Sequence, residues 1–206
     1  MTTTRADLLL LRHGRTVANA SGLLLGRADP PLDETGERQA AALAAEVCSG
    51  RFGPVVRIVS SPLERTRATA QAVADLAGLP VEVDHRLVEL DYGEFDGVPL
   101  ADLPAETWAA WRADLSFRPP GGETLLELSD RVRELCDELL SPDRPPGVTV
   151  AVSHVSPIKA AAAWAMGVDD SVSWRMHLDP ASITAVVARG RSAALSVFND
   201  TAHLHD

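Results

Sequence analysis

The sequence is poor in cysteine and lacks long hydrophobic runs, and each shortage narrows the classes of protein to consider. It has only two cysteines, Cys48 and Cys136, whose spacing matches no metal-binding or redox motif. Both lie in segments with helical patterning, so we expect reduced thiols and a cytoplasmic setting. No apolar run approaches the length that crosses a bilayer. Residues 1–7 are too few and too polar for a secretion signal.

Positive charge is scarce as well. The chain carries 19 lysines and arginines against 29 aspartates and glutamates, which gives a formal net charge of −10. This balance disfavours nucleic acids and anionic membranes as partners. A small anionic substrate would need several arginines gathered at one place to overcome that background. The candidates for this gathering are Arg12, Arg15, Arg27, Arg65 and Arg67.

Composition and patterning indicate one domain, residues 1–206, in which strands and helices alternate. The 206 residues are 46% hydrophobic, enough to bury a full core. Four consecutive leucines at residues 8–11 suit a strand that is buried on both faces. The predicted fold is α/β, a three-layer αβα sandwich with a mostly parallel central sheet and helices on both faces. Strands are expected at residues 8–11, 55–59, 81–83, 148–152, 183–188 and 193–198.

Several helix starts can be read from capping residues. Asp33 is placed to cap a helix that runs to Cys48. Thr124 and Glu127 match a capping box, and the leucines that follow at helical spacing predict a core-facing stripe. Two serine-proline pairs, at residues 61–62 and 156–157, predict helices with serine at the N-cap and proline in the first turn.

The most informative residues follow the leucine strand. Arg12 and His13 end that strand, and Gly14 permits a sharp turn after it. Ligands of open parallel sheets bind where strands end and helices begin, because the helix amides there favour anions. A guanidinium and an imidazole at this edge therefore predict a pocket for an anion, with phosphate as the first candidate.

Two further predicted strand ends carry similar residues. Arg65 follows the second strand in the first turns of a helix, and His154 ends the strand at residues 148–152. Taken alone, a histidine at a strand end is more often a hydrogen-bonded or surface residue, and such an arginine is more often a surface charge. If the three strands are parallel neighbours, however, all three junctions lie on one edge of the sheet and form one site.

These residues belong to an ordered set of motifs through which the chain resembles the histidine phosphatase superfamily, also called the phosphoglycerate mutase-like family. The resemblance runs from Leu8 to about Asn199. It implies that His13 is the nucleophile that accepts the phosphoryl group and that Glu89 is the general acid and base. It further implies that Arg12, Arg65 and a cationic His154 hold the phosphoryl oxygens, with Asn19 and Thr16 adding contacts. The motifs are Leu11-Arg12-His13-Gly14 with Thr16 and Asn19, Leu32 to Gly36, Ser60-Ser61-Pro62-Leu63 to Ala70, Glu89-Leu90 with Tyr92-Gly93-Glu94-Phe95, Pro120-Gly121-Gly122-Glu123-Thr124, and Val152-Ser153-His154.

Physical chemistry agrees with these implied roles. Two arginines bind phosphoryl oxygens with planar, often bidentate geometry. A neutral imidazole is a competent nucleophile, so His13 must be neutral. Because side chains supply the cations, we expect no metal and no cofactor. Among the carboxylates near Glu89 in the sequence, Asp91, Glu94 and Glu123 are the alternatives for the acid.

The chain departs from the family pattern at two places. Many members have glutamate or glutamine where this chain has Arg15, which either reads a substrate anion or is an exposed loop charge. Many members also have two glycines after the second histidine, where this chain has Val155 and Ser156. The helix predicted to begin at Ser156 could still offer its amides to phosphate. A similar His-Val-x-Pro-Ile-Lys sequence occurs in relatives described as α-ribazole phosphatases.

The predicted function follows from the small size of the cap-like insertion at about residues 98–121. Trp108 and Trp111 lie three apart on a predicted helix there, and they either line the mouth of the pocket or belong to the core. A small cap leaves water access to a phosphohistidine, which favours hydrolysis. We therefore expect a metal-independent phosphomonoesterase for a small phosphorylated metabolite. The alternatives are a cofactor-dependent phosphoglycerate mutase and a non-catalytic relative that binds a phosphate ligand. The oligomeric state is open, with a homodimer as one possibility that the resemblance suggests.

Overall fold

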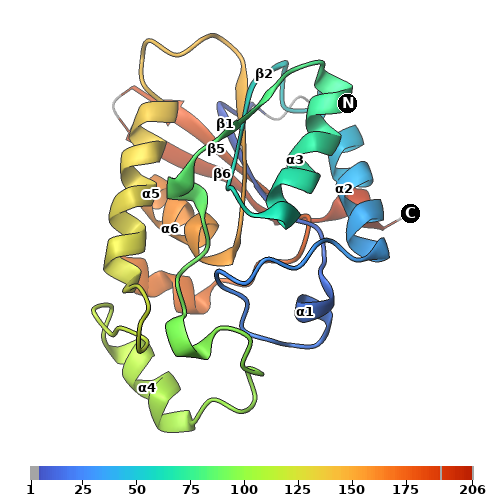
Figure 1. Ribbon diagram of the computed structural model, residues 1–206. Coiled ribbons are helices and arrows are strands. Elements are labelled where there is room, and N and C mark those ends of the chain that lie inside the picture. Colours follow the sequence, from blue (N-terminus) through green and yellow to red (C-terminus); the bar gives the residue numbers. More distant parts are fainter. Residues whose placement is uncertain (1–4, 191, 206) are drawn as a thin grey trace.

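Six strands form one mixed sheet in the order β3-β2-β4-β1-β5-β6 (Figure 1). The computed structural model describes residues 5–190 and 192–205, so part of the stretch tested for a secretion signal, residues 1–4, lies outside the described residues. Neighbouring strands from β3 to β1 pair in parallel, whereas β5 is antiparallel to both β1 and β6. The predicted mostly parallel sheet is confirmed. The strands are β1 (Leu8–Arg12), β2 (Val55–Ser60), β3 (Val81–Val83), β4 (Val148–Ser153), β5 (Ile183–Arg189) and β6 (Ser192–Asp200).

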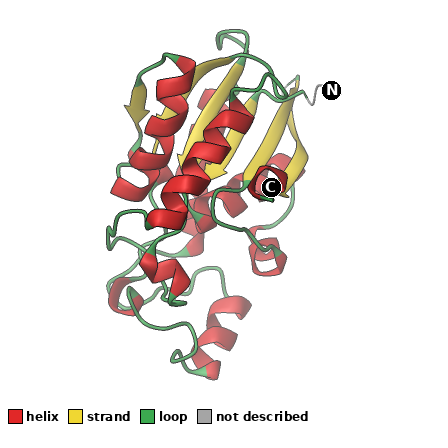
Figure 2. Ribbon diagram, turned by 90° about the vertical axis from the view of Figure 1, so that its right-hand side faces the viewer, coloured by secondary structure: helices red, strands yellow, loops and turns green. Residues whose placement is uncertain are grey.

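Helices cover both faces of this sheet, which confirms the three-layer sandwich (Figure 2). Helices α2 (Glu34–Val47) and α3 (Glu64–Ala77) pack together on one face, and α5 (Leu125–Leu139) and α6 (Val155–Met166) pack together on the other. The shorter elements are α1 (Val17–Ala20), α4 (Ala105–Ala113), and the 3-10 helices η1 (His85–Leu87), η2 (Gly93–Phe95), η3 (Asp170–Arg175) and η4 (Ala202–Leu204). Among the described residues, no helix is long and apolar enough to cross a membrane.

The four leucines of β1 explain why the chain needs both helical layers. Leu8 and Leu10 pack into the core shared with α5 and α6, whereas Leu9 and Leu11 pack into the core shared with α2 and α3. Successive side chains of a strand point to opposite faces of the sheet. An unbroken apolar run is therefore stable only in a strand that is covered on both sides, as the sequence predicted.

Two predicted helix starts are wrong in position, and both errors lie at strand ends. Helix α3 begins at Glu64, and its N-cap is Leu63, two residues after the predicted cap Ser61 and without a side-chain cap hydrogen bond. The Ser61 hydroxyl is instead 2.8 Å from Nε2 of His154. Helix α6 begins earlier than predicted, with His154 itself as the N-cap. The capping box of Thr124 is confirmed.

Gly14 serves a close approach more than a sharp turn. Its φ is not among the positive values of the described glycines, but a Cβ here would collide with the carbonyl oxygen of Gly36. In return, a Cβ at Gly36 would collide with the carbonyl oxygen of Arg15. The two glycines allow the first turn of α2 to press against the segment that follows β1, which fixes the backbone next to His13.

The segment predicted as a cap-like insertion lies beyond the carboxyl ends of the parallel strands, with α4 at the end of the molecule (Figures 1 and 2). Trp111 of α4 is only 2% exposed and belongs to the same core as α5 and α6. The insertion is therefore packed onto the main body, close to the edge where the predicted site residues lie.

Candidate active site

The sheet brings the three predicted strand-to-helix junctions together. Strands β2, β4 and β1 are adjacent and parallel, with Arg12 paired to Ser153 and Ser60 paired to Val152. The backbone continues this register past the strands, since the amide of His13 donates to the carbonyl of Ser153. The prediction that all three junctions share one edge is confirmed. We call the buried residues Arg12, His13, Arg65, Glu89 and His154 the polar cluster.

His13 is held as a neutral imidazole with one free nitrogen. Its ring is buried, and Nδ1 lies 2.7 Å from the carbonyl oxygen of Gly14, to which it donates. This contact assigns the proton to Nδ1 and leaves the lone pair of Nε2 free. Burial, together with the charges of Arg12 and Arg65, lowers the pKa of His13 well below its ordinary value. The residue is therefore neutral at physiological pH, as a histidine nucleophile must be.

Two guanidinium groups flank His13, and each donates hydrogen bonds to backbone carbonyls. Nη1 of Arg12 donates to the carbonyl of Leu178 at 2.6 Å. Arg65 is fully buried and donates to the carbonyls of Ala28 and Gly26, at 2.7 and 2.8 Å. Within the described part of the chain, Nε of each arginine is buried without a partner. Burial lowers the pKa of Arg12 to about 10, so this side chain keeps its charge at neutral pH.

The loop that holds Arg65 was not predicted. Its carbonyls are fixed because the amides of Gly26 and Ala28 donate to the carboxylate of Asp96, at 2.8 and 2.7 Å. A carboxylate oxygen of Asp29 lies 3.6 Å from Nη1 of Arg65. Asp96 and Arg65 are 31 positions apart in the sequence, and nothing local to either residue indicates this support.

His154 completes the cluster opposite His13. The two ring centroids are 5.1 Å apart with an interplanar angle of 60°. Its Nε2 contacts the hydroxyl of Ser61, while its buried Nδ1 has no partner among the described residues. Burial, then the neighbouring His13 and Arg65, lowers the pKa of His154 well below its ordinary value. Burial first, and then the neighbouring charges, therefore disfavour the cationic form of His154 in the site without a bound anion.

Glu89 is buried beside these cations and is held by the start of α6. Its carboxylate accepts from the amides of Val155 at 3.0 Å and of Ser156 at 3.1 Å. The helix predicted to begin at Ser156 was expected to offer its amides to phosphate, but Glu89 occupies the amide of Ser156. The hydroxyl of Ser153 donates to the carbonyl of Leu87 at 2.6 Å, which fixes the segment that precedes Glu89.

The alternative carboxylates lie elsewhere. Glu123 pairs with Arg131 at 2.8 Å, and Asp91 accepts from the amide of Gly93. Glu94 is exposed. Of the four carboxylates considered, only Glu89 lines the cavity next to His13.

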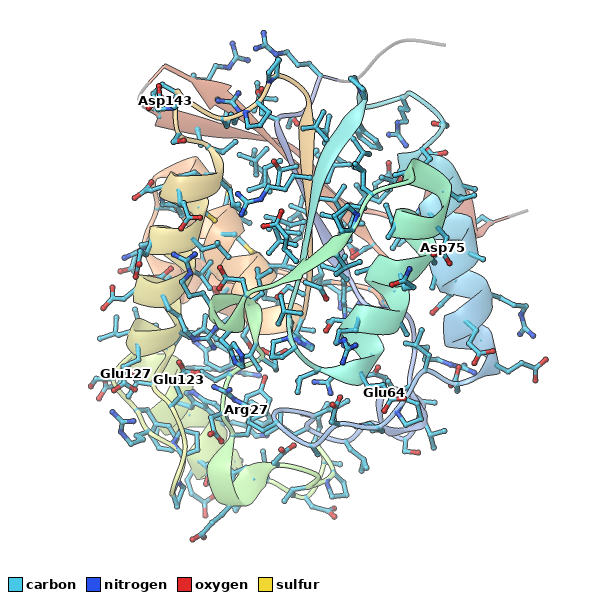
Figure 3. All side chains as sticks on the ribbon, turned by 45° about the horizontal axis from the view of Figure 1, so that its top comes forward. Arg27, Glu64, Asp75, Glu123, Glu127 and Asp143 are labelled. Atoms are coloured by element: carbon cyan, nitrogen blue, oxygen red, sulfur yellow. The ribbon has the colours of Figure 1, made fainter. Side chains whose placement is uncertain are left out.

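The remaining predicted binding residues divide into two groups. Asn19 lines the cavity, and Thr16 is buried beneath it as the N-cap of α1, with a capping box to Asn19. Three of the arginines proposed to bind the substrate anion do not line the cavity. Arg15 pairs with Asp33 at 2.9 Å, Arg27 reaches Glu123 at 3.5 Å (Figure 3), and Arg67 is exposed at a separate hollow beside Asp29 and Glu64.

The polar cluster opens into a cavity of about 370 Å³, which we call the polar cavity. Its wall includes one residue that the sequence analysis missed, Lys159 of α6. This lysine is half-buried, and burial lowers its pKa. The signal in the sequence that could have identified Lys159 is that it is a single cationic residue within an alanine-rich helix. The other lining residues are Arg12, His13, Asn19, Gly22, Leu23, Leu24, Leu25, Glu89, Tyr92, Leu100, Val155 and Pro180.

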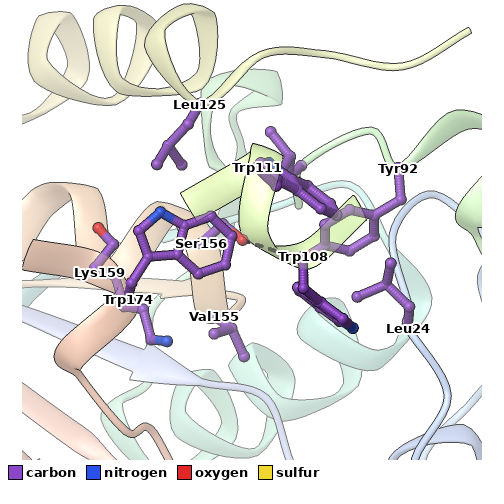
Figure 4. A pocket seen from close by; sticks show the side chains of 11 residues that line it. Leu24, Tyr92, Trp108, Trp111, Leu125, Val155, Ser156, Lys159 and Trp174 are labelled. Carbon is purple, nitrogen blue, oxygen red and sulfur yellow. Dashed lines mark hydrogen bonds between the residues drawn. The ribbon is translucent and has the colours of Figure 1, made fainter. Parts of the chain in front are cut away.

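Both interpretations of the tryptophan pair apply. Trp108 and Trp111 stack with their ring centroids 5.7 Å apart and an interplanar angle of 14°. Trp111 is buried in the core, and Trp108 packs partly buried against it. Both also line a second cavity, which shares Leu24, Tyr92, Val155 and Lys159 with the polar cavity (Figure 4).

Comparisons with known proteins place the chain in a family. Residues 8–201 match the family model described as histidine phosphatase superfamily (branch 1). A bifunctional protein of Mycobacterium tuberculosis is 37% identical over 98% of the chain, which spans only 56% of that relative's length. A protein named probable phosphoglycerate mutase, of Yersinia enterocolitica, is 34% identical over 87% of the chain and 84% of its own length. The solved structure of a mycobacterial glucosyl-3-phosphoglycerate phosphatase has a TM-score of 0.85 and 32% identity, and the match covers 95% of this chain and 100% of that one.

Proposed function

The chain belongs to branch 1 of the histidine phosphatase superfamily, and from that premise we propose that it is a metal-independent phosphomonoesterase acting on a small phosphorylated metabolite. The observation that supports this proposal most is the set of buried nitrogens around His13. Nε of Arg12, Nε of Arg65 and Nδ1 of His154 have no partner among the described residues. Buried polar groups without partners are costly, so a site that keeps three of them fits an anionic ligand that satisfies them.

In the first step of the proposed reaction, Nε2 of His13 attacks phosphorus. The N–P bond forms as the ester P–O bond breaks, and Glu89 gives a proton to the departing alkoxide. Arg12, Arg65 and His154 bind the phosphoryl oxygens, on which charge is spread in the transition state. The bound dianion also favours the charged form of His154, so we expect this histidine to gain its proton only with the substrate.

In the second step, water attacks the phosphohistidine. Glu89, now deprotonated, takes a proton from that water as the N–P bond breaks. Phosphate leaves, and His13 and Glu89 return to their starting states. Each carbonyl that holds an arginine is fixed before substrate arrives, so the cations need little reorganisation during either step.

Hydrolysis of p-nitrophenyl phosphate in the presence of a chelator tests the proposal. We expect turnover by the protein and loss of nearly all of it in His13→Ala. A variant at the exposed Arg67, Arg67→Ala, is the control and is expected to keep the activity of the unchanged chain. Undiminished turnover by His13→Ala would remove His13 from the nucleophile role.

The similarity to the probable phosphoglycerate mutase supports a second candidate function. A mutase would convert 3-phosphoglycerate to 2-phosphoglycerate, and a bisphosphate would stimulate that conversion. We expect hydrolysis to exceed isomerisation, because the insertion at residues 98–121 is short. A non-catalytic relative would bind phosphate and turn over none of a broad panel of phosphomonoesters.

Arg15 as a substrate contact, the cytoplasmic setting and a homodimer stay predictions. The free thiols of Cys48 and Cys136 are compatible with a reducing compartment. Sedimentation of the purified protein measures the oligomeric state directly.

A further inference from the structure

The cavity lined by Trp108 and Trp111, which we call the aromatic cavity, lies against the polar cavity and has a different character. Its volume is about 100 Å³. Four aromatic side chains contribute to its wall, Tyr92, Trp108, Trp111 and Trp174 (Figure 4). The wall is completed by Leu24, Leu90, Leu125, Val155, Ser156, Lys159 and Ser173.

The aromatic rings form a packed and oriented wall. Trp174 stands nearly perpendicular to both Trp108 and Trp111, with interplanar angles of 85° and 72° and centroid distances of 6.4 and 5.8 Å. Tyr92 meets Trp111 edge-on at 5.8 Å. Faces and edges of rings arranged in this way suit a further flat ring, which gains from both stacking and edge-to-face contacts.

Unpartnered polar atoms occur in this wall as well. Nε1 of Trp111, Nε1 of Trp174 and Oγ of Ser173 are buried without hydrogen-bond partners among the described residues. Trp111 is 2% exposed and Ser173 is 6% exposed. Three groups able to donate therefore lie in residues that line one small cavity, and acceptor atoms are the partners that they lack.

The two cavities are neighbours, because four residues belong to the walls of both. These residues are Leu24, Tyr92, Val155 and Lys159. Val155 also donates its amide to Glu89, the residue proposed to protonate the leaving oxygen. A group attached to that oxygen would therefore lie next to the aromatic cavity.

We propose that the aromatic cavity binds the leaving group of the substrate, and that this group carries a single flat ring with hydrogen-bond acceptor atoms. The inference rests on the proposed phosphomonoesterase activity. A cavity of about 150 Å³ holds benzene, so a cavity of about 100 Å³ limits the group to one ring and excludes a larger fused system. Lys159 lies at the junction, where its charge meets the polar linkage between ring and phosphate.

The test compares leaving groups of similar chemical reactivity. Benzyl phosphate, pyridylmethyl phosphate and glycerol 1-phosphate are all esters of primary alcohols, so differences in rate report binding of the alcohol. We expect kcat/KM for the two ring-bearing esters to exceed that for glycerol 1-phosphate by about tenfold or more. The pyridyl ester, which adds an acceptor atom, is expected to be the best of the three. Equal kcat/KM for all three esters would overturn the inference and leave the proposed function intact.

Two tryptophan variants make the comparison specific. Trp108→Leu removes a ring from the aromatic cavity, whereas Trp164→Leu removes one from the outer part of α6, where its Nε1 donates to Asp137. Trp108→Leu is expected to lower kcat/KM for the ring-bearing esters by about tenfold and to change that for glycerol 1-phosphate by less than about twofold. Trp164→Leu is expected to leave kcat/KM unchanged for the ring-bearing esters and for glycerol 1-phosphate. Equal loss for ring-bearing and glycerol esters in Trp108→Leu would contradict the inference.

A binding measurement separates this inference from the proposed function. Benzylphosphonate and methylphosphonate resist hydrolysis, and quenching of tryptophan fluorescence reports their binding. Tighter binding of benzylphosphonate, lost in Trp108→Leu but kept in Trp164→Leu, would support the ring site even if no ester were hydrolysed. Equal affinity for both phosphonates would overturn the ring site whatever the enzyme's activity.

Discussion

The polar cluster takes its residues from the ends of β1 and β4, the start of α3 and the segment after η1, whereas the aromatic cavity takes its rings from α4, η3 and the segment around η2. In the polar cluster, backbone groups hold every side chain except that of His154. Carbonyls hold Arg12, His13 and Arg65, and helix amides hold Glu89. In the aromatic cavity, side chains are held mainly by one another, through stacked and edge-to-face rings.

This difference teaches how one fold can keep its chemistry and change its substrate. Backbone positions are set by sheet register and tolerate few changes nearby, as the mutual contact of Gly14 and Gly36 shows. Side-chain walls can be rebuilt by substitution without moving the strands. We therefore expect variants of the polar cluster to lower activity toward every ester, and variants of the aromatic cavity to change only the preference among esters.

The largest effect is expected from removing the proton donor. Glu89→Gln keeps the size of the side chain but cannot give a proton to the leaving oxygen. We expect kcat to fall by about 10²–10⁴ for benzyl and glycerol esters alike. Steady-state kinetics on both esters measures the fall. Glu123→Gln is the matched control, because Glu123 pairs with Arg131 and does not line either cavity. A similar loss in the two variants would contradict the assignment of Glu89.

Shortening the buried guanidinium should have a slightly smaller effect. Arg65→Lys keeps the charge but removes Nε and the planar fork, so the phosphoryl oxygens lose a directed donor. We expect kcat/KM to fall by about 10²-fold, independently of the leaving group. Arg67→Lys, two residues along the same helix on an exposed side chain, is the control and should retain full activity. A loss confined to ring-bearing esters would break the proposed division between the two cavities.

The two buried histidines predict that folding stability depends on pH. Their pKa values are lowered in the folded chain, so below about pH 6.5 the unfolded chain binds protons that the folded chain excludes. The stability that these neutral histidines contribute is fully present above that pH and is lost as the pH falls towards the folded pKa values. Each histidine adds about 1.4 kcal/mol per pH unit to the slope of the free energy of unfolding against pH.

Urea denaturation at about pH 7, 6 and 5 measures this slope, above the range in which most carboxylates titrate. His154→Gln removes one titrating group and should reduce the slope by the share of that histidine, about 1.4 kcal/mol per pH unit. The half-buried His203, whose pKa is also lowered by burial, keeps its own share in this variant. An unchanged slope would mean that folding does not lower the pKa of His154. No histidine lines the aromatic cavity, so substitutions there should leave the slope of unfolding free energy against pH unchanged.

The smallest effect is expected at the start of α5, which supplies Leu125 to the aromatic cavity. Thr124→Ala removes the capping box with Glu127. We expect the free energy of unfolding to fall by about 1 kcal/mol, with little change in kcat for glycerol 1-phosphate. Thermal and urea unfolding measure the first effect, and steady-state kinetics measures the second. A large loss of kcat would show that the two cavities are coupled through α5.

The sequence was sufficient to predict the sheet edge and the residues that meet there. The leucine run of β1, the leucine stripe of α5 and the alternation of strands and helices each follow from local patterns that the structure confirms. Once the strands were taken as parallel neighbours, it followed that one site contains Arg12, His13, Arg65 and His154. Glu89 was identified by its place before the Tyr92 motif, and the cavity places it next to His13.

Other features depend on contacts between distant residues, which local patterns do not encode. Ser61 looked like a helix cap, but its hydroxyl contacts His154, 93 positions away. The start of α6 looked free to bind an anion, but Glu89 occupies its amides. Lys159 and Trp174 face cavities formed by other segments, so their place in the site appears only in the folded chain.

The most direct test of the account is to trap the phosphoryl group on the protein. Glu89→Gln would be mixed with p-nitrophenyl phosphate, whose leaving group departs without a proton, and quenched in alkali, in which phosphohistidine survives. The modified residue and ring nitrogen would then be identified by mass spectrometry and nuclear magnetic resonance. Because Nδ1 of His13 donates to the carbonyl of Gly14, the account predicts one phosphoryl group on Nε2 of His13. Turnover without phosphorylated His13, or a phosphoryl group on Nδ1 or on another residue, would contradict it.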